Sequence, residues 1–82
     1  MATAMNKNVR LGEPDAMVPA SPFLLWLDSQ RRSNWTLWLT DTQTRYIERI
    51  MKNRPAHLNV HSIDAILWAL GREELLSYLY PD

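Results

Sequence analysis

The chain has 82 residues, nine basic and nine acidic side chains, and no cysteine. That length allows one small domain with one modest core. The lack of cysteine excludes disulfides and thiolate metal sites, and no apolar run approaches the roughly 18–20 residues of a membrane-spanning helix. Only two glycines occur, Gly12 and Gly71, which excludes the glycine-rich phosphate-binding loops. Met1 to Arg10 has no hydrophobic signal core, so we expect a cytoplasmic protein rather than a secreted one.

Charge is unevenly placed along the chain. Residues 31–54 contain six basic and two acidic side chains, a net charge of +4, between stretches of −1 (residues 1–30) and −3 (residues 55–82). A basic segment is what a phosphate-contacting surface requires. The acidic end would oppose DNA binding if it lay on the same face, so the arrangement in space decides.

The N-terminal residues 1–20 have little periodicity and are interrupted by Gly12, Pro14 and Pro19. This pattern predicts a flexible arm. Lys7 and Arg10 would be its DNA contacts if the arm reached into a minor groove. The remaining residues, 21–82, are expected to form a single helical domain.

The first expected helix runs from about Pro22 to about Arg32, after the start signal Ser21-Pro22 and with an apolar face formed by Phe23, Leu24, Trp26 and Leu27. Ser33-Asn34 is expected to be a break. Residues 35–39 fit a short strand or a single helical turn, and we favour the turn because no partner strand is evident. The four tryptophans, Trp26, Trp35, Trp38 and Trp68, are interpreted as core or half-core residues.

The next expected helix begins near Thr42 and ends at Arg54, since Pro55 restricts the residue before it. Thr40, Asp41 and Thr42 are suitable N-cap residues. Helical spacing divides this segment into a buried side (Tyr46, Ile47, Ile50 and Met51) and an exposed side led by Gln43, Arg45 and Arg49.

Two more helices follow. Asn59 is the expected cap of a helix that buries Ile63, Ile66, Leu67 and Leu70, and Gly71 closes it. Glu73 and Glu74 open a last short helix, which buries Leu75, Leu76 and Leu79 and ends at Pro81. The expected fold is therefore all-α, a compact bundle of about five short helices with a helix-turn-helix-like arrangement.

The run Thr42-x-Thr-Arg45-x-Ile47-x-Arg49-Ile50, followed after a loop by Leu58-Asn59-Val60-x-x-Ile63-Asp64-x-Ile66-Leu67-x-Ala69-Leu70-Gly71 and a closing Leu79-Tyr80-Pro81, resembles small phage-encoded helix-turn-helix proteins. These are related to the Cro/repressor type and occur in actinobacterial phages. The resemblance covers about residues 18–81. It implies a sequence-specific regulator of transcription that binds double-stranded DNA inside a bacterial host cell.

Carried over by position, the resemblance places the start of the recognition helix at Thr42, Gln43, Thr44 and Arg45. The hydrogen-bonding shapes of Gln43 and Arg45 suit adenine and guanine, respectively. Arg49, Lys52 and Arg54 suit phosphates, which position a protein without specifying sequence.

Other functions remain open alongside DNA binding. The tryptophan-rich segment Trp35–Trp38, the zero net charge and the acidic end favour a protein-binding adaptor or an inhibitor of a host protein. The aromatic surface could instead pair two copies of the chain. We expect no enzyme, because no nucleophile–base–orienter set can be assembled and His61 with Asp64 reads as an ordinary helix-surface pair. We expect no metal site and no cofactor, since His57 and His61 have no further partner at ligand spacing.

Overall fold

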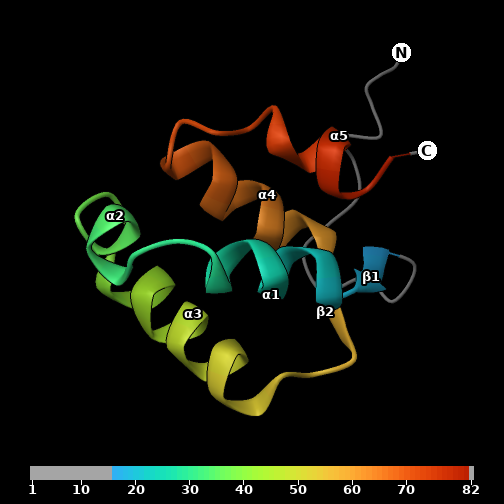
Figure 1. Cartoon of the computed structure of the whole chain (residues 1–82), viewed down its shortest axis with the longest axis horizontal. Helices are drawn as coiled ribbons and strands as arrows, with labels where there is room; N and C mark the ends of the chain where they lie inside the picture. The colour runs from blue at the N-terminus through green and yellow to red at the C-terminus, as the bar shows by residue number, and fades with distance from the viewer. Residues whose placement is uncertain (1–15, 82) are drawn as a thin grey trace.

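The computed structural model describes residues 16–81, which are mostly helical (Figure 1). In chain order this part contains β1 (Met17–Pro19), α1 (Ser21–Asp28), α2 (Arg32–Thr36), α3 (Asp41–Asn53), β2 (His57–Asn59), α4 (Val60–Ala69) and α5 (Leu75–Leu79). Five helices agree with the prediction of about five. Among the described residues, none of the helices has the length and apolar character needed to cross a bilayer.

A small sheet corrects the prediction of an all-α fold. β1 and β2 pair antiparallel, with Met17 opposite Asn59, Val18 opposite Leu58 and Pro19 opposite His57. Each strand has three residues, too few to produce a recognisable alternation of polar and apolar side chains. The pairing also joins segments far apart in the sequence, so no local signal could indicate it.

The same sheet moves the boundary of the predicted N-terminal arm. Residues 1–15, including Lys7 and Arg10, lie outside the described part of the chain. Residues 17–19 form β1, and the Ala20 N–H continues the pairing by donating to the Ala56 carbonyl at 3.0 Å. Residues 17–20 are therefore part of the folded unit rather than of an arm.

The first two helices differ in extent from the prediction. α1 ends at Asp28, earlier than the expected Arg32, because the Ser29 hydroxyl donates to the Trp26 carbonyl at 2.6 Å and competes with helix continuation. α2 then takes up Ser33 and Asn34, the expected break, and ends before Leu37. The choice of a helix over a strand is correct for Trp35 and Thr36 only, because the helix starts earlier, at Arg32, and residues 37–39 form turns beyond its end.

The ends of α3 and α4 match the local signals. Thr40 caps α3, and Arg54 terminates it in the left-handed conformation (φ 47°) before Pro55. Asn59 caps α4 by accepting from the His61 N–H at 2.8 Å. Gly71 has φ 71° and its N–H donates to the Trp68 carbonyl, while the Arg72 N–H donates to the Leu67 carbonyl, which is the Schellman arrangement.

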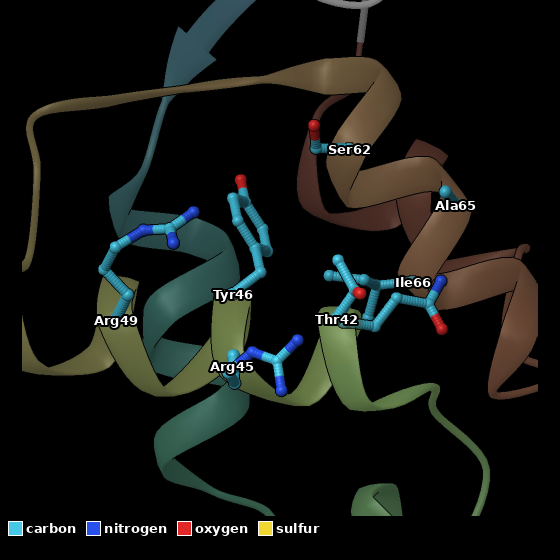
Figure 2. Close-up of a pocket in the computed structure, with 8 residues that line it drawn as sticks. Thr42, Arg45, Tyr46, Arg49, Ser62, Ala65 and Ile66 are labelled. Atoms are coloured by element: carbon cyan, nitrogen blue, oxygen red, sulfur yellow. The ribbon is translucent and has the colours of Figure 1, made fainter.

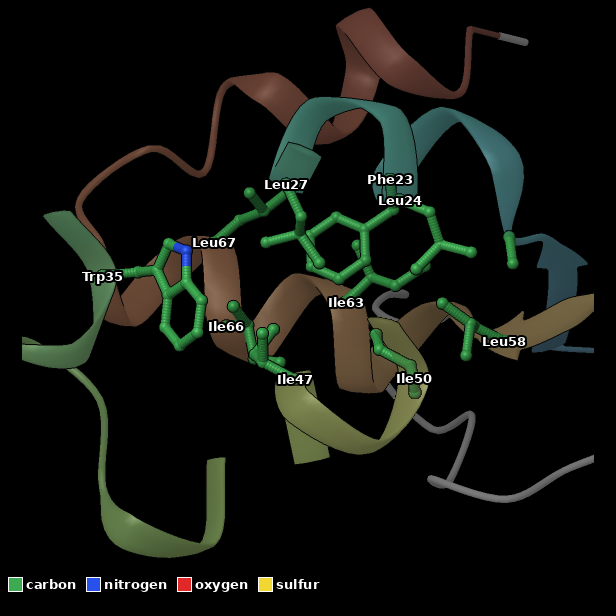
Figure 3. Packing of buried hydrophobic residues seen from close by; sticks show 11 residues of the cluster. Phe23, Leu24, Leu27, Trp35, Ile47, Ile50, Leu58, Ile63, Ile66 and Leu67 are labelled. Carbon is green, nitrogen blue, oxygen red and sulfur yellow. The ribbon is translucent and has the colours of Figure 1, made fainter. Parts of the chain in front are cut away.

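One core holds these elements together (Figure 3). Buried side chains come from α1, α2, α3, β2 and α4, namely Phe23, Leu24, Leu27, Trp35, Ile47, Ile50, Leu58, Ile63, Ile66 and Leu67. The tryptophan interpretation is correct for buried Trp35 and half-buried Trp26. It is wrong for Trp38 and Trp68, which are 67% and 69% exposed. The predicted buried side of α3 is confirmed at Ile47 and Ile50, with Tyr46 and Met51 half-buried.

The last helix is tied to the start of the first. The Tyr80 hydroxyl donates to the Pro19 carbonyl at 2.6 Å and accepts from the Phe23 N–H at 3.3 Å. Ser21, whose side chain could have capped the helix as part of the start signal, is instead the first residue of α1, and the N-cap residue, Ala20, has no side chain able to cap. Tyr80 thus satisfies one of the backbone donors that the first turn of α1 leaves free.

Candidate nucleic-acid interface

The start of α3 is fixed by a capping box. The Thr40 hydroxyl accepts from the Gln43 N–H at 3.1 Å, and the Gln43 Oε1 accepts from the Thr40 N–H at 3.1 Å. This reciprocal pair satisfies two backbone donors and holds the first turn in place. Gln43 therefore has a structural role, and the spacing Thr40-x-x-Gln43 is the sequence signal that the prediction overlooked.

That task conflicts with the predicted role of Gln43 as an adenine reader. Reading adenine requires the amide oxygen and the amide nitrogen together. The oxygen is already used within the capping box, and the side chain is only partly exposed. Of its neighbours, Thr42 is exposed and Thr44 is half-buried.

The exposed side of α3 carries three cations. Arg45, Arg49 and Lys52 are all exposed, and helical spacing puts them on one face because they are separated by four and three positions. None of the three forms an ion pair with an acidic residue among residues 16–81. The Arg49 guanidinium lies over the Tyr46 ring, 5.5 Å from its centroid. Among the predicted site residues, these three are therefore the largest group of charges without an acidic partner in the described part of the chain.

Arg54 lies apart from that group. Its guanidinium holds the Asp28 carboxylate through two hydrogen bonds, Nη1 to Oδ1 at 3.1 Å and Nη2 to Oδ2 at 2.9 Å. The pair lowers the pKa of Asp28 and raises that of Arg54, chiefly through this hydrogen bonding. Arg54 thus clamps the end of α3 to the end of α1, and its charge is largely compensated.

A cleft of about 340 Å³ lies beside the cationic face, between α3 and α4 (Figure 2). Its lining consists of Thr42, Gln43, Arg45, Tyr46, Arg49, Ser62, Ala65 and Ile66. Figure 2 shows Tyr46 rising from α3 towards Ser62, with Arg49 on one side of the ring and Thr42 and Ile66 on the other. Burial raises the pKa of the Tyr46 hydroxyl, opposed by its hydrogen bond with Ser62 and by the charge of Arg49.

Of the acidic side chains, exposed Asp41 lies four positions before Arg45 on α3 and forms no ion pair among residues 16–81, whereas others are paired. Glu48 on α3 pairs with Arg32, whose guanidinium also lies 5.5 Å from the Trp35 ring centroid. Glu74 pairs with Arg72 in the turn between α4 and α5. In Figure 1 that acidic turn is at the top of the view and α3 is at the bottom, so the two lie on opposite sides of the molecule.

A second hollow, of about 200 Å³, lies among the aromatic residues. It is lined by Trp26, Gln30, Asn34, Trp35, Trp38, Leu70 and Arg72. Leu37 and Trp38, in the connection between α2 and α3, are 80% and 67% exposed. The indole nitrogen of buried Trp35 has no hydrogen-bond partner within the described part of the chain.

Sequence reasoning thus identified the three free cations of α3 but missed the lining from α4, Ser62, Ala65 and Ile66. Those residues follow the helical period of α4, and only the packing of α4 against α3 brings them to the same cleft. Within residues 16–81 no three histidine or acidic side chains are grouped as metal ligands. No protein family, curated protein or solved structure matches this chain.

Proposed function

We propose that this protein binds double-stranded DNA through the exposed face of α3 and acts as a transcriptional regulator of the Cro/repressor-like, phage-encoded type. The observation that carries the proposal is the group Arg45, Arg49 and Lys52, three exposed cations on one face without acidic partners among residues 16–81. Arginine and lysine on such a face supply the phosphate contacts that dominate DNA affinity.

The surrounding geometry supports a helix-turn-helix arrangement. α2 and α3 are joined by residues 37–40, a connection of the length typical of this motif. α1 and α4 hold the buried side of α3 through Ile47 and Ile50. In this arrangement α3 is the recognition helix and enters the major groove.

The individual roles follow from exposure and pairing. Arg45, on the first exposed turns of α3, is assigned to a guanine edge, and Arg49 and Lys52 to phosphates. Thr42 is exposed and is assigned to the backbone, whereas Gln43 and Thr44 support the helix start. Arg54 is assigned to the clamp with Asp28 rather than to DNA.

The test is the salt dependence of DNA affinity. We compare the unmodified protein with Arg45→Ala/Arg49→Ala by fluorescence anisotropy and low-salt gel shift. The control, Arg31→Ala/Arg72→Ala, removes two charges from outside α3. If both α3 arginines contact phosphates, the slope of log K against log[salt] falls by about 1.8 in the first variant, and by about 0.9 if Arg45 reads a base. Unchanged retention of DNA by the first variant would refute the proposal.

A second candidate function is protein binding, favoured by the adjacent exposed side chains Leu37 and Trp38. Their partner would be a host protein or a second copy of this chain. Light scattering at rising protein concentration tests the second case: the molecular mass of the unmodified protein should increase and that of Trp38→Ser should not. If the unmodified protein and Trp38→Ser both keep the mass of a monomer, self-association is excluded.

A further inference from the structure

The cleft between α3 and α4 has the features of a small-molecule site. We propose that it binds a ligand made of one aromatic ring system bearing a phosphate, of the class of the nucleoside monophosphates. Its volume of about 340 Å³ lies near the lower end of the range for ligand pockets, about 300–1,000 Å³. The ligand is therefore small, and a single nucleotide is a suitable size.

The two arginines of the cleft specify the acidic group. Arg45 and Arg49 both line it, no acidic side chain does, and neither arginine is in an ion pair among residues 16–81. An arginine fork matches the geometry of a phosphate and forms charge-assisted hydrogen bonds with it. An anion at this place neutralises charges that the fold leaves uncompensated.

The side chain of Tyr46 favours an aromatic ring as the second part of the ligand. Arg49 covers one side of the half-buried Tyr46 ring, and the apolar side chains of Ala65 and Ile66 line the cleft beyond it. Figure 2 shows this order across the cleft, with α4 forming the opposite wall. A planar ring placed against Tyr46 buries apolar surface and stacks in the offset arrangement that aromatic rings prefer. The Thr42 hydroxyl, and the capacity that the Ser62 hydroxyl keeps beside its hydrogen bond with Tyr46, are left to bond the polar edge of the ligand.

A bound ligand would also affect DNA. Arg45 and Arg49 belong to the cleft and to the proposed DNA-contacting face, so the ligand and DNA compete for the same two guanidiniums. This competition rests on the proposed function, whereas ligand binding itself does not. The ligand would then release the regulator from its DNA site.

The test uses AMP as the probe in an amide NMR titration of the full chain. Adenosine supplies the ring without the anion, and inorganic phosphate supplies the anion without the ring, at matched ionic strength. We expect AMP to shift the amides of Tyr46, Ala65 and Ile66 and to bind at least about tenfold more tightly than either fragment. No shift with millimolar AMP, or phosphate binding as tight as AMP, would overturn the assignment.

Two variants test the location. Ala65→Met fills the cleft without changing any charge, and Ser77→Met places the same side chain at an exposed position of α5. AMP affinity should fall about tenfold or more in the first and remain unchanged in the second, with circular dichroism confirming that both fold. Equal AMP affinity in both variants would place the ligand elsewhere.

A third probe and a DNA measurement separate the remaining outcomes. Tighter binding of a 5′-phosphorylated trinucleotide than of AMP would assign the cleft to a nucleic-acid strand and overturn the small-ligand assignment. Anisotropy with duplex DNA then tests competition. Failure of DNA binding with intact AMP binding rejects the proposed function alone, and intact DNA binding with no AMP response rejects this inference alone.

Discussion

Tyr80 provides the sharpest test of how the fold is closed. Its hydroxyl bonds both the Pro19 carbonyl and the Phe23 N–H, at the point where β1 passes into α1. Tyr80→Phe keeps the ring, which packs against the core, and removes only the hydroxyl. We predict a loss of stability with no change of fold.

The magnitude follows from the two hydrogen bonds. Each contributes about 0.5–1.5 kcal/mol net, and the exposed Pro19 side can regain a water, whereas the part-buried Phe23 N–H is left less well satisfied. We expect the free energy of unfolding to fall by about 1–2 kcal/mol. For a domain of this size that corresponds to a decrease in melting temperature of roughly 5–15 °C.

The assay is urea unfolding followed by tryptophan fluorescence, with thermal circular dichroism as a second probe. Tyr78→Phe is the matched control, because Tyr78 is 77% exposed and has no hydrogen bond among the described residues. Its unfolding free energy should change by less than about 0.5 kcal/mol, as for most surface substitutions. Equal stability of the two variants would show that Tyr80 does not cap α1.

The pH dependence gives a second check on the same residue. Burial raises the pKa of the Tyr80 hydroxyl above its ordinary value, with the Phe23 backbone acting in the opposite direction. The protonated form is therefore favoured in the folded state. The difference in unfolding free energy between the unmodified protein and Tyr80→Phe should be constant below the ordinary tyrosine pKa of about 10. It should disappear as the pH rises through the pKa that Tyr80 has in the folded protein. An advantage that persists at higher pH would contradict the hydroxyl's role as donor.

Three further perturbations probe the fold and the position of α3. Ile47→Ala removes a fully buried side chain and should cost about 2–5 kcal/mol in urea unfolding; a loss under 1 kcal/mol would mean that α3 is not anchored there. Thr40→Ala breaks the capping box and should cost about 1 kcal/mol, whereas Thr40→Asn should retain most of the stability. Asp28→Asn removes the partner of Arg54 and should make the free energy of unfolding less dependent on pH in acid. Because the pKa of Asp28 is lowered, the stability advantage of the unmodified protein exists above the ordinary value of about 3.9 and fades below it. If the unfolding free energies of the variant and of the unmodified protein fall equally as the pH is lowered, the pair does not couple α1 to α3.

Local chemistry made several features predictable. The ends of α3 and α4 depend on Pro55, Asn59 and Gly71, each of which acts on its own backbone or on residues a few positions away. The cationic face of α3 is likewise fixed by helical spacing alone. Features of this kind need no knowledge of the rest of the chain.

Features that depend on residues outside the local segment could not be predicted from the sequence. Arg54 pairs with Asp28 across 26 positions, which turns an expected phosphate contact into a clamp. Trp38 is exposed although its neighbour Trp35 is buried, because the chain leaves α2 before reaching it. Gln43 is a different case: it was an expected base reader because its amide has the right shape, although the spacing Thr40-x-x-Gln43 is the local signal of the capping box that the structure contains.

The strand pair has a consequence for the speed of folding. Val18 and Leu58 meet across forty positions, so β1 and β2 close a loop that contains α1, α2 and α3. Helices form within about a microsecond, whereas closing a loop of that length costs chain entropy before any contact repays it. The strand pair should therefore raise the contact order of an otherwise helical chain, so that folding is slower than for a simple helical bundle of equal length.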